Sequence, residues 1–356
     1  MEINKRPLFN EFGDIETNKK KMINGNTTNL NDFNNMKYTW VSEWYRQAMN
    51  NFWIPEEINL AQDLKDYKKL TKEEKAAYDK ILSFLIFLDS IQTANLGNIN
   101  SYITASEVNL CLTIQAFQEA VHSQSYSYML DSICSPEERN EILFQWKDDA
   151  ILLQRNKFIG DLYNNFLEDS SIENFIKSVM ANYILEGVYF YSGFMFFYNL
   201  ERNGKMPGSA QEIRYINRDE NTHLWLFRSI IKELKEEIPE VFTKELKEEL
   251  REMMRTGVEH EIAWGHYVIG DNVTGINKNL IERYIKYIGN LRAKAIGLEP
   301  LFEGYNENPA PWVDYYADAN QVKTDFFEAK STWWSITAKS FGRRRHRGKP
   351  TREPCV

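Results

Sequence analysis

Apolar residues recur at intervals of three and four positions over most of the chain, a spacing that places them on one face of an α-helix. No stretch alternates apolar and polar residues for long enough to predict a strand, and no Asn-Gly or Asp-Gly pair is flanked by such alternation. The pattern therefore predicts an all-α protein.

Signals for helix starts and ends divide this pattern into segments. A Ser or Thr followed three residues later by Glu can cap a helix start through two reciprocal hydrogen bonds, and this arrangement occurs at 71–74, 135–138 and 209–212. Asn203 and Gly204 predict the end of the helix before the third start. Further helices are expected over 38–49, 243–268 and 277–295.

The two ends of the chain differ in composition from its body. Residues 1–37 are polar and rich in Asn, which favours an extended or partly ordered arm. Residues 38–325 are expected to form one helical domain, and residues 326–356 a flexible tail that becomes basic towards its end. Within the body, the charge-dense stretches 231–237 and 244–249 are expected to be solvated helix surface.

Charge and composition argue against several classes of protein. A net charge of −8 argues against nucleic-acid binding, and no apolar segment follows the charged amino terminus as a secretory signal requires. The aromatic stretch 183–198 is too short to span a membrane and contains Glu186, so it is expected to be a buried helix. The three cysteines show neither metal-binding spacing nor an even number for disulfides, which favours a reducing cytoplasm.

Two Glu-x-x-His motifs lie 101 residues apart, Glu119 with His122 and Glu220 with His223. Residues three apart share one face of a helix, so each pair can bind one metal ion. A single motif of this kind is a weak indication, because a solvated helix surface produces the same spacing by chance. The presence of two motifs in similar surroundings makes the metal interpretation stronger.

Each motif is preceded by a carboxylate in an apolar run. Asp89 lies 30 residues before Glu119 and Glu186 lies 34 before Glu220, offsets that fit antiparallel helix pairs whose side chains meet midway. A buried, ionised carboxylate without a partner is costly or protonates, and two metal cations would remove that cost. A carboxylate from each of two helices and Glu-x-x-His from two others form the dinuclear site of ferritin-like bundles, so we expect two metal ions per chain. The alternative is that these acids pair with Arg or Lys.

Tyr126 follows His122 by four residues and therefore lies on the same helix face, one turn from the expected metal ions. Phe190 and Phe194 follow Glu186 at four and eight positions, so apolar groups should wall the site. Such a setting would protect a tyrosyl radical from reductants. The alternative is an ordinary core tyrosine with a hydrogen-bonded hydroxyl.

Together these motifs resemble the radical-generating small subunit of class I ribonucleotide reductase, from about residue 38 to 330. The segments that carry the resemblance are Asn51-Phe-Trp53-Ile-Pro55-Glu-Glu, Leu88-Asp89-Ser-Ile-Gln92, Glu119-Ala-Val-His122-Ser-Gln-Ser-Tyr126, Leu185-Glu186-Gly-Val-Tyr-Phe190-Tyr-Ser-Gly-Phe194 and Arg218-Asp219-Glu220-Asn-Thr-His223. The resemblance implies a ferritin-like helical bundle that forms a homodimer. It also implies an oxidoreductase that works with a catalytic large subunit to reduce ribonucleotides to deoxyribonucleotides for DNA replication.

The resemblance also implies roles for single residues. It assigns one metal ion to Asp89, Glu119 and His122 and the other to Glu186, Glu220 and His223, with some carboxylates bridging. Tyr126 would store the radical, and the metal would be iron or manganese. Trp53 and Asp219 match the relay of the family, in which the tryptophan bonds the aspartate and the aspartate reaches His122; otherwise Trp53 is a packing residue.

The carboxy terminus departs from the family pattern. In the family this segment docks on the large subunit and carries a tyrosine for the radical relay. Here the last tyrosine is Tyr316, and Trp333 and Trp334 follow it before the basic run. Whether either tryptophan replaces the tyrosine stays open at this point.

Two other functions fit the same residues. One is a ferritin-like di-metal oxidase or monooxygenase that acts on a small organic substrate without a stored radical. The other is a non-enzymatic metal-storage protein. His260 and His266 also lie among acids but form no Glu-x-x-His, so they are expected to be hydrogen-bonding groups of a helix.

Overall fold

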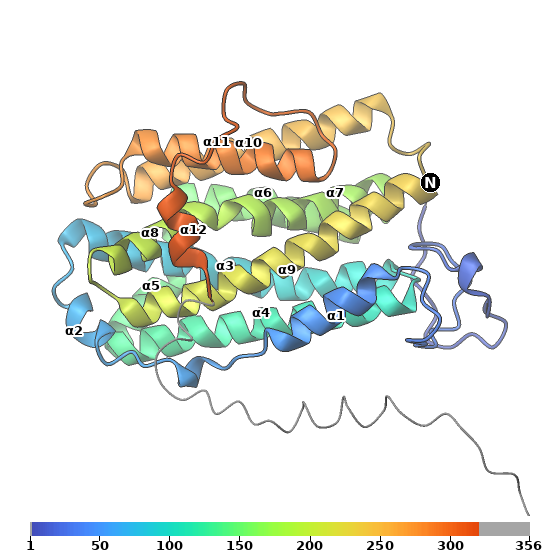
Figure 1. The fold of residues 1–356 in the computed structure, drawn as a ribbon, viewed down its shortest axis with the longest axis horizontal. Helices are drawn as coiled ribbons and strands as arrows, with labels where there is room; N and C mark the ends of the chain where they lie inside the picture. Colours follow the sequence, from blue (N-terminus) through green and yellow to red (C-terminus); the bar gives the residue numbers. More distant parts are fainter. Residues whose placement is uncertain (1, 320–356) are drawn as a thin grey trace, which may run out of the picture. The chain divides into compact units, whose positions relative to one another are not determined.

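The computed structural model describes residues 2–319, and the regular secondary structure within this range is helical (Figure 1). The α-helices are α1 (Trp40–Asn50), α2 (Asp63–Tyr67), α3 (Lys72–Tyr102), α4 (Ser106–Ile133), α5 (Pro136–Asp148), α6 (Ala150–Glu168), α7 (Ile172–Ile184), α8 (Tyr191–Arg202), α9 (Pro207–Glu237), α10 (Lys244–Val268), α11 (Lys278–Ala295) and α12 (Pro311–Ala317). Two short 3-10 helices, η1 (Thr17–Lys19) and η2 (Pro55–Glu57), and a π-helical segment, η3 (Leu185–Tyr189), complete the elements. Isolated bridges are the only β-type pairing between residues 2 and 319, so the predicted all-α class is confirmed.

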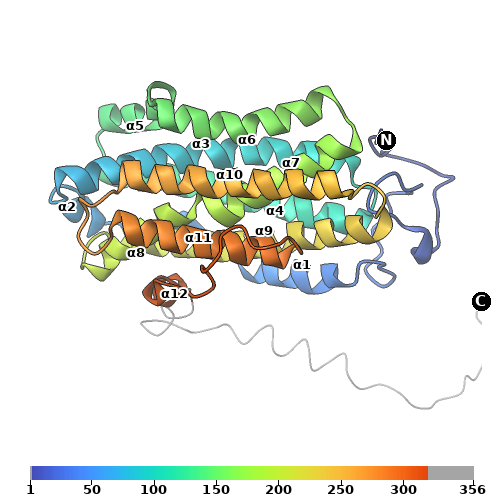
Figure 2. The same cartoon turned by 90° about the horizontal axis from the view of Figure 1, so that it is seen from above.

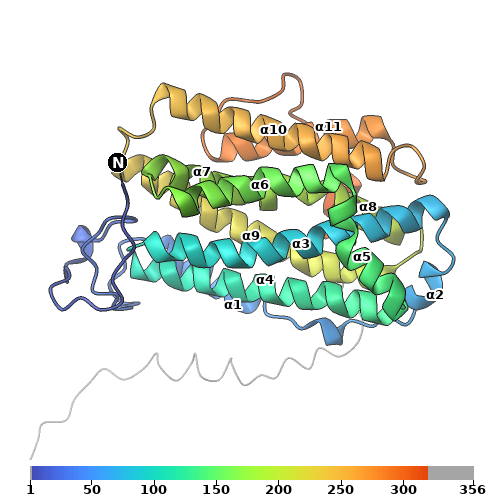
Figure 3. The ribbon, with the colours of Figure 1, turned by 180° about the vertical axis from the view of Figure 1, so that it is seen from behind.

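The long helices lie side by side along one direction, and the chain reverses between them (Figures 1 and 3). Helix α3 packs against α4, and α9 packs against α7, η3 and α8. Figure 2 shows α5 and α6 along one side of α3, while α10 and α11 cover α7, η3 and α8. The two helix pairs expected from the offsets between the carboxylates and the Glu-x-x-His motifs are therefore neighbours in one ferritin-like bundle.

Most predicted helix boundaries are confirmed. At the start of α3, the Thr71 hydroxyl accepts from the Glu74 N–H while the Glu74 carboxylate accepts from the Thr71 N–H. Ser135 and Glu138 cap α5 in the same way. The helices expected over 38–49, 243–268 and 277–295 are α1, α10 and α11.

The predicted helix start at Ser209 is wrong, because α9 begins two residues earlier at Pro207. Met206 enters the helix in the left-handed conformation with φ of 53°. The Asp63 carboxylate then takes the capping role from a distant segment, since it accepts from the N–H of Gly208 at 2.9 Å and of Ser209 at 2.6 Å. Glu212 consequently lies inside the helix, fully buried.

The aromatic stretch around Glu186 is buried as predicted, but it is not one regular helix. Helices α7 and α8 are separated by η3, whose wider π-helical turn contains Glu186. A π-helical turn accommodates an extra residue and shifts the direction of the side chains that follow, and such turns are frequent at functional sites. The π-helical segment therefore affects how Glu186 is presented to the helices packed around it.

The amino-terminal segment is extended and attached at several points. Between residues 2 and 37 its only helix is η1, and isolated bridges join Glu2 to Ser171 and Ile23 to Ile103. Residues 2–318 belong to one compact unit. The predicted tail at 326–356, with Trp333 and Trp334, lies outside the described residues. Within the described range, none of the helices has the length and apolar character that crossing a membrane would require.

Candidate metal centre

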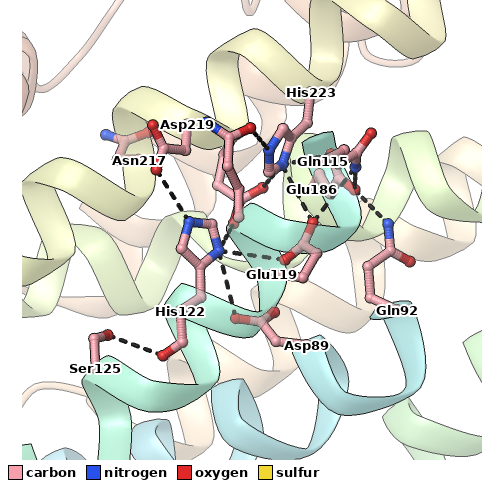
Figure 4. Close-up of polar contacts among 12 residues, drawn as sticks. Asp89, Gln92, Gln115, Glu119, His122, Ser125, Glu186, Asn217, Asp219 and His223 are labelled. Atoms are coloured by element: carbon pink, nitrogen blue, oxygen red, sulfur yellow. Dashed lines mark hydrogen bonds and ion pairs between the residues drawn. The ribbon is translucent and has the colours of Figure 1, made fainter. Parts of the chain in front are cut away.

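The six side chains predicted as metal ligands converge in the middle of the bundle, and Figure 4 labels all of them except Glu220. Helix α3 supplies Asp89, α4 supplies Glu119 and His122, η3 supplies Glu186, and α9 supplies Glu220 and His223. All six are at most 1% exposed. Four segments far apart in the sequence thus contribute to one site in the core.

The two histidines turn their Nδ1 atoms towards the carboxylates. The Nδ1 atom of His122 lies 3.2 Å from Glu119, 3.4 Å from Glu220 and 3.9 Å from Asp89. The Nδ1 atom of His223 lies 3.1 Å from Glu220, 3.2 Å from Glu119 and 3.5 Å from Glu186. Glu119 and Glu220 therefore contact both histidines.

This arrangement contains two overlapping ligand sets. In each set, one donor atom per residue lies within 4.8 Å of all the others. One set is Asp89, Glu119, His122 and Glu220, and the other is Glu119, Glu186, Glu220 and His223. Because Glu119 and Glu220 belong to both sets, they are suited to bridge two metal ions.

Unsatisfied polar atoms show that the site fits a pair of cations. Both carboxylate oxygens of Asp89, one oxygen each of Glu186 and Glu220, and the Nδ1 atom of His122 are buried without a hydrogen-bond partner. Among residues 2–319 no Arg or Lys forms an ion pair with these carboxylates, so the alternative of Arg or Lys pairing is wrong. Four carboxylates and two neutral imidazoles carry four negative charges, which two divalent cations balance. Oxygen and imidazole donors of this kind suit first-row transition metals.

Without cations, several acids and histidines of the cluster have pKa values far from their usual ones. Burial raises the pKa of Asp89 and of Glu186 well above the usual range, and neighbouring carboxylates add to the increase for Asp89. Burial also works to raise the pKa of Glu119, but the two histidines outweigh it and lower that pKa to about 2. For His223, burial favours the neutral form, yet the surrounding carboxylates raise its pKa well above the usual value. Cations would take the place of protons in this cluster.

A second layer of hydrogen bonds orients the histidines. The Asp219 Oδ2 atom lies 3.4 Å from Nε2 of His122 and accepts from the indole N–H of Trp53 at 2.8 Å. The amide oxygen of Gln118 lies 3.0 Å from Nε2 of His223. With Nε2 protonated and bonded in this way, each ring keeps its Nδ1 lone pair for the centre of the cluster.

Three side-chain amides donate hydrogen bonds to the same carboxylate oxygen of Glu186, Oε1. The side chain of Gln115 donates to it at 2.6 Å and that of Asn182 at 2.8 Å, and Gln92 donates to the same atom (Figure 4). These bonds hold Oε1 of Glu186 in place, and its other carboxylate oxygen, Oε2, is the one that faces His223.

Tyr126 is fully buried beside this cluster. Its hydroxyl makes no hydrogen bond of full geometry, but it lies within reach of the carboxylate of Asp89. Burial raises the pKa of Tyr126 well above the usual value, and Asp89 is the nearby charge that contributes most. The phenol therefore stays neutral beside Asp89.

The sequence located the six candidate ligands, Tyr126, Trp53 and Asp219, and the structure brings all of them together, while their roles stay predictions. The sequence alone assigned no role to Gln118 or Asn182. A Gln directly before a motif Glu, in a helix with few charges, was the only available signal for Gln118. His260 and His266 bond Tyr189 and the Lys278 carbonyl, respectively, as hydrogen-bonding groups of a helix.

Comparisons with known proteins agree with this geometry. A family model described as "Ribonucleotide reductase, small chain" matches residues 30–309. The chain is 69% identical to the ribonucleoside-diphosphate reductase subunit beta of Treponema pallidum, over 93% of this chain and 95% of that protein. It is 41% identical to the subunit of the same name from Halalkalibacterium halodurans, over 90% and 93%. The solved structure of a ribonucleotide reductase R2 subunit from Clostridium botulinum superposes with a TM-score of 0.87 at 55% identity, covering 89% of this chain and 99% of that one.

Proposed function

The chain belongs to the small-subunit family of class I ribonucleotide reductase, and on that basis we propose that Tyr126 stores the radical this subunit provides for ribonucleotide reduction. As a small subunit it works with a large subunit. The observation that carries the proposal is the fully buried phenol of Tyr126, which lies beside Asp89 and the two overlapping ligand sets.

The six core residues would hold the metal pair, with Asp89 and His122 on one side, Glu186 and His223 on the other, and Glu119 and Glu220 between them. When bound, such a pair supplies the oxidising power to remove one electron from a phenol. Tyr126 would release its phenolic proton at the same time, because a buried phenol radical cation is strongly acidic, and the adjacent carboxylate of Asp89 would accept that proton. The complete burial of Tyr126 would then keep reductants and water from the radical.

The route for the radical to leave would follow Trp53, Asp219 and His122. The Asp219 Oδ2 atom contacts both the indole N–H of Trp53 and the imidazole of His122, so the three side chains form one continuous chain. Trp53 is 5% exposed, and its neighbour Phe52 is 63% exposed, so this chain runs from near the surface to the candidate ligands. This supports a relay role for Trp53 in addition to packing.

The metal would be iron or manganese. Carboxylate and imidazole donors accept both, and relative affinity does not determine which one a cell inserts. Metal quantification on the purified protein, combined with electron paramagnetic resonance, distinguishes them.

A homodimer in the cytoplasm is the proposed state of the protein. An apolar surface on α1, the segment after it and α4 supports contact with a second copy. There, the rings of Phe52 and Phe117 stack at 6.3 Å although the residues are 63% and 52% exposed, and Met49 beside them is 54% exposed. Introducing a charge with Phe117→Glu should shift the protein from dimer to monomer in sedimentation velocity.

Replacing Tyr126 by Phe tests the central proposal. The variant should bind the same metals but show no tyrosyl radical signal and no ribonucleotide reduction with the large subunit. Tyr128→Phe is the matched control, because it lies on the same helix and its hydroxyl bonds only the Ile58 carbonyl, at 2.9 Å. If the Tyr126→Phe protein kept an oxidase activity on a small organic substrate, the di-metal oxidase alternative would be favoured instead.

A further inference from the structure

A groove of about 780 Å³ lies between α9, α10, α11 and the start of α1, and none of the candidate metal ligands lines it. Its basic side chains outnumber its acids five to one. They are Arg228, Lys232, Lys235, Lys247 and Lys294, against Glu233. Since the whole chain has a net charge of −8, this local excess of positive charge does not follow from composition.

Most of these positive charges are not neutralised by the protein. The side chains of Arg228, Lys247 and Lys294 form no hydrogen bond or ion pair with any residue in the described range. The only acid lining the groove, Glu233, accepts a hydrogen bond from the indole N–H of Trp40 at 3.1 Å. Lys232 contacts Glu236 only at 3.8 Å.

Lys235 shows the effect of this excess charge. Its ammonium group is half-buried and donates to the carbonyl of Ile296 at 2.5 Å. Burial lowers its pKa, and the positive charge of Lys247 lowers it further. The last acid of α9, Glu237, does not neutralise Lys235, because Glu237 is bonded to Lys37 and to Met22 in the amino-terminal segment. The charge-dense stretches predicted to be simply solvated thus form part of a groove that lacks counter-charge.

Two tryptophans add a flat apolar surface to the groove. Trp40 and Trp225 line it, are partly exposed, and stack with no other ring within residues 2–319. A volume of this size accommodates a small molecule, and clustered Lys and Arg beside aromatic faces suit an anion with a planar part.

We propose that this groove binds a polyphosphate chain, either free or carried by a nucleotide whose base lies against the tryptophans. The phosphates would lie between Arg228, Lys247 and Lys294, the cations without a protein partner. The site would be separate from the metal centre.

The proposal is tested by calorimetric titration of the metal-loaded, full-length small subunit alone, so that every bound ligand sits on this chain. The ligands are inorganic tripolyphosphate and ATP, each with excess magnesium to protect the dinuclear centre, and tryptophan fluorescence is followed in parallel. We expect saturable binding of one ligand per chain near physiological salt. Lys247→Glu and Lys294→Glu should each weaken it about tenfold or more.

Lys65→Glu is the matched control. Lys65 is exposed on α2, at the other end of the bundle from the start of α1 (Figure 1). The substitution Lys65→Glu changes the net charge by the same amount as Lys247→Glu or Lys294→Glu. Its affinity should stay at the wild-type value, and the radical content of all three variants should be unchanged, which shows that they are folded. Tighter binding of ATP than of tripolyphosphate would identify a nucleotide as the ligand, and equal affinity would identify the free polyphosphate. Absence of saturable binding, or equal weakening by Lys65→Glu, would overturn the proposal.

Discussion

Replacing Gln118 by Leu probes whether the second layer of hydrogen bonds sets the metal affinity. The amide oxygen of Gln118 accepts from the Nε2–H of His223 at 3.0 Å, and both side chains are at most 4% exposed. Leu has a similar size but no acceptor. The variant therefore leaves a buried imidazole N–H without a partner and removes the bond that keeps the proton on Nε2.

The size of the effect follows from these contacts. An unsatisfied buried donor costs about 1–3 kcal/mol. In the metal-free variant, His223 can avoid this cost by losing its Nε2 proton and keeping the proton on Nδ1, where Glu119 and Glu220 lie 3.2 and 3.1 Å away. When a metal ion occupies Nδ1, the proton must return to the unpartnered Nε2, so the metal affinity should fall about 10–100-fold, or about 1.4–2.7 kcal/mol.

Stepwise binding of Mn²⁺ to the metal-free protein, followed by electron paramagnetic resonance of the free ion, measures this change. Only the step that involves His223 should weaken, and the step that involves His122 serves as an internal control for correct folding. Gln124→Leu is the matched variant, because Gln124 lies on the same helix but bonds only Glu56 at the surface. If Gln118→Leu bound both ions with wild-type affinity, the proposed tautomer control would be refuted.

Three further outcomes are expected. Trp53→Phe removes the 2.8 Å bond to Asp219, so the tyrosyl radical should still form while ribonucleotide reduction with the large subunit is abolished; retained turnover would mean that Trp53 only packs. Glu212 is fully buried without an ion-pair partner among residues 2–319. Burial raises its pKa well above 4.5 although the Ser125 hydroxyl lowers it, so ionisation of Glu212 destabilises the folded state increasingly as the pH rises above that value. Urea unfolding should therefore show Glu212→Leu to be more stable by about 1–3 kcal/mol at pH 8, with a smaller gain near pH 5, and an equal gain at both pH values would contradict this. Removing the metals should lower the melting temperature by about 5 °C or more. The decrease should be larger at pH 8 than at pH 6, because the raised pKa values of Asp89 and Glu186 make the metal-free protein less stable as the pH rises. Calorimetry at the two pH values checks this.

Local sequence signals were sufficient for most of the fold. Capping boxes at 71–74 and 135–138 are formed as predicted, because both partners of each hydrogen bond lie within four residues of one another. The same signal failed at 209–212, because Asp63, more than a hundred residues earlier, caps the helix from outside. The π-helical segment was also missed, since nothing in the residues around Glu186 separates a π-helical turn from a regular buried helix.

The sequence by itself determined the all-α class and, through its motifs, the resemblance to the family. It also singled out the six acids and imidazoles with their neighbouring phenol, because helical periodicity fixes which nearby residues share a face. Only the tertiary structure decided which carboxylates contact both histidines, that Gln118 rather than an acid faces Nε2 of His223, and that cations from α9, α10 and α11 line one groove. These features depend on how helices distant in sequence pack against one another, and the spacing of residues within a single helix carries no information about that packing.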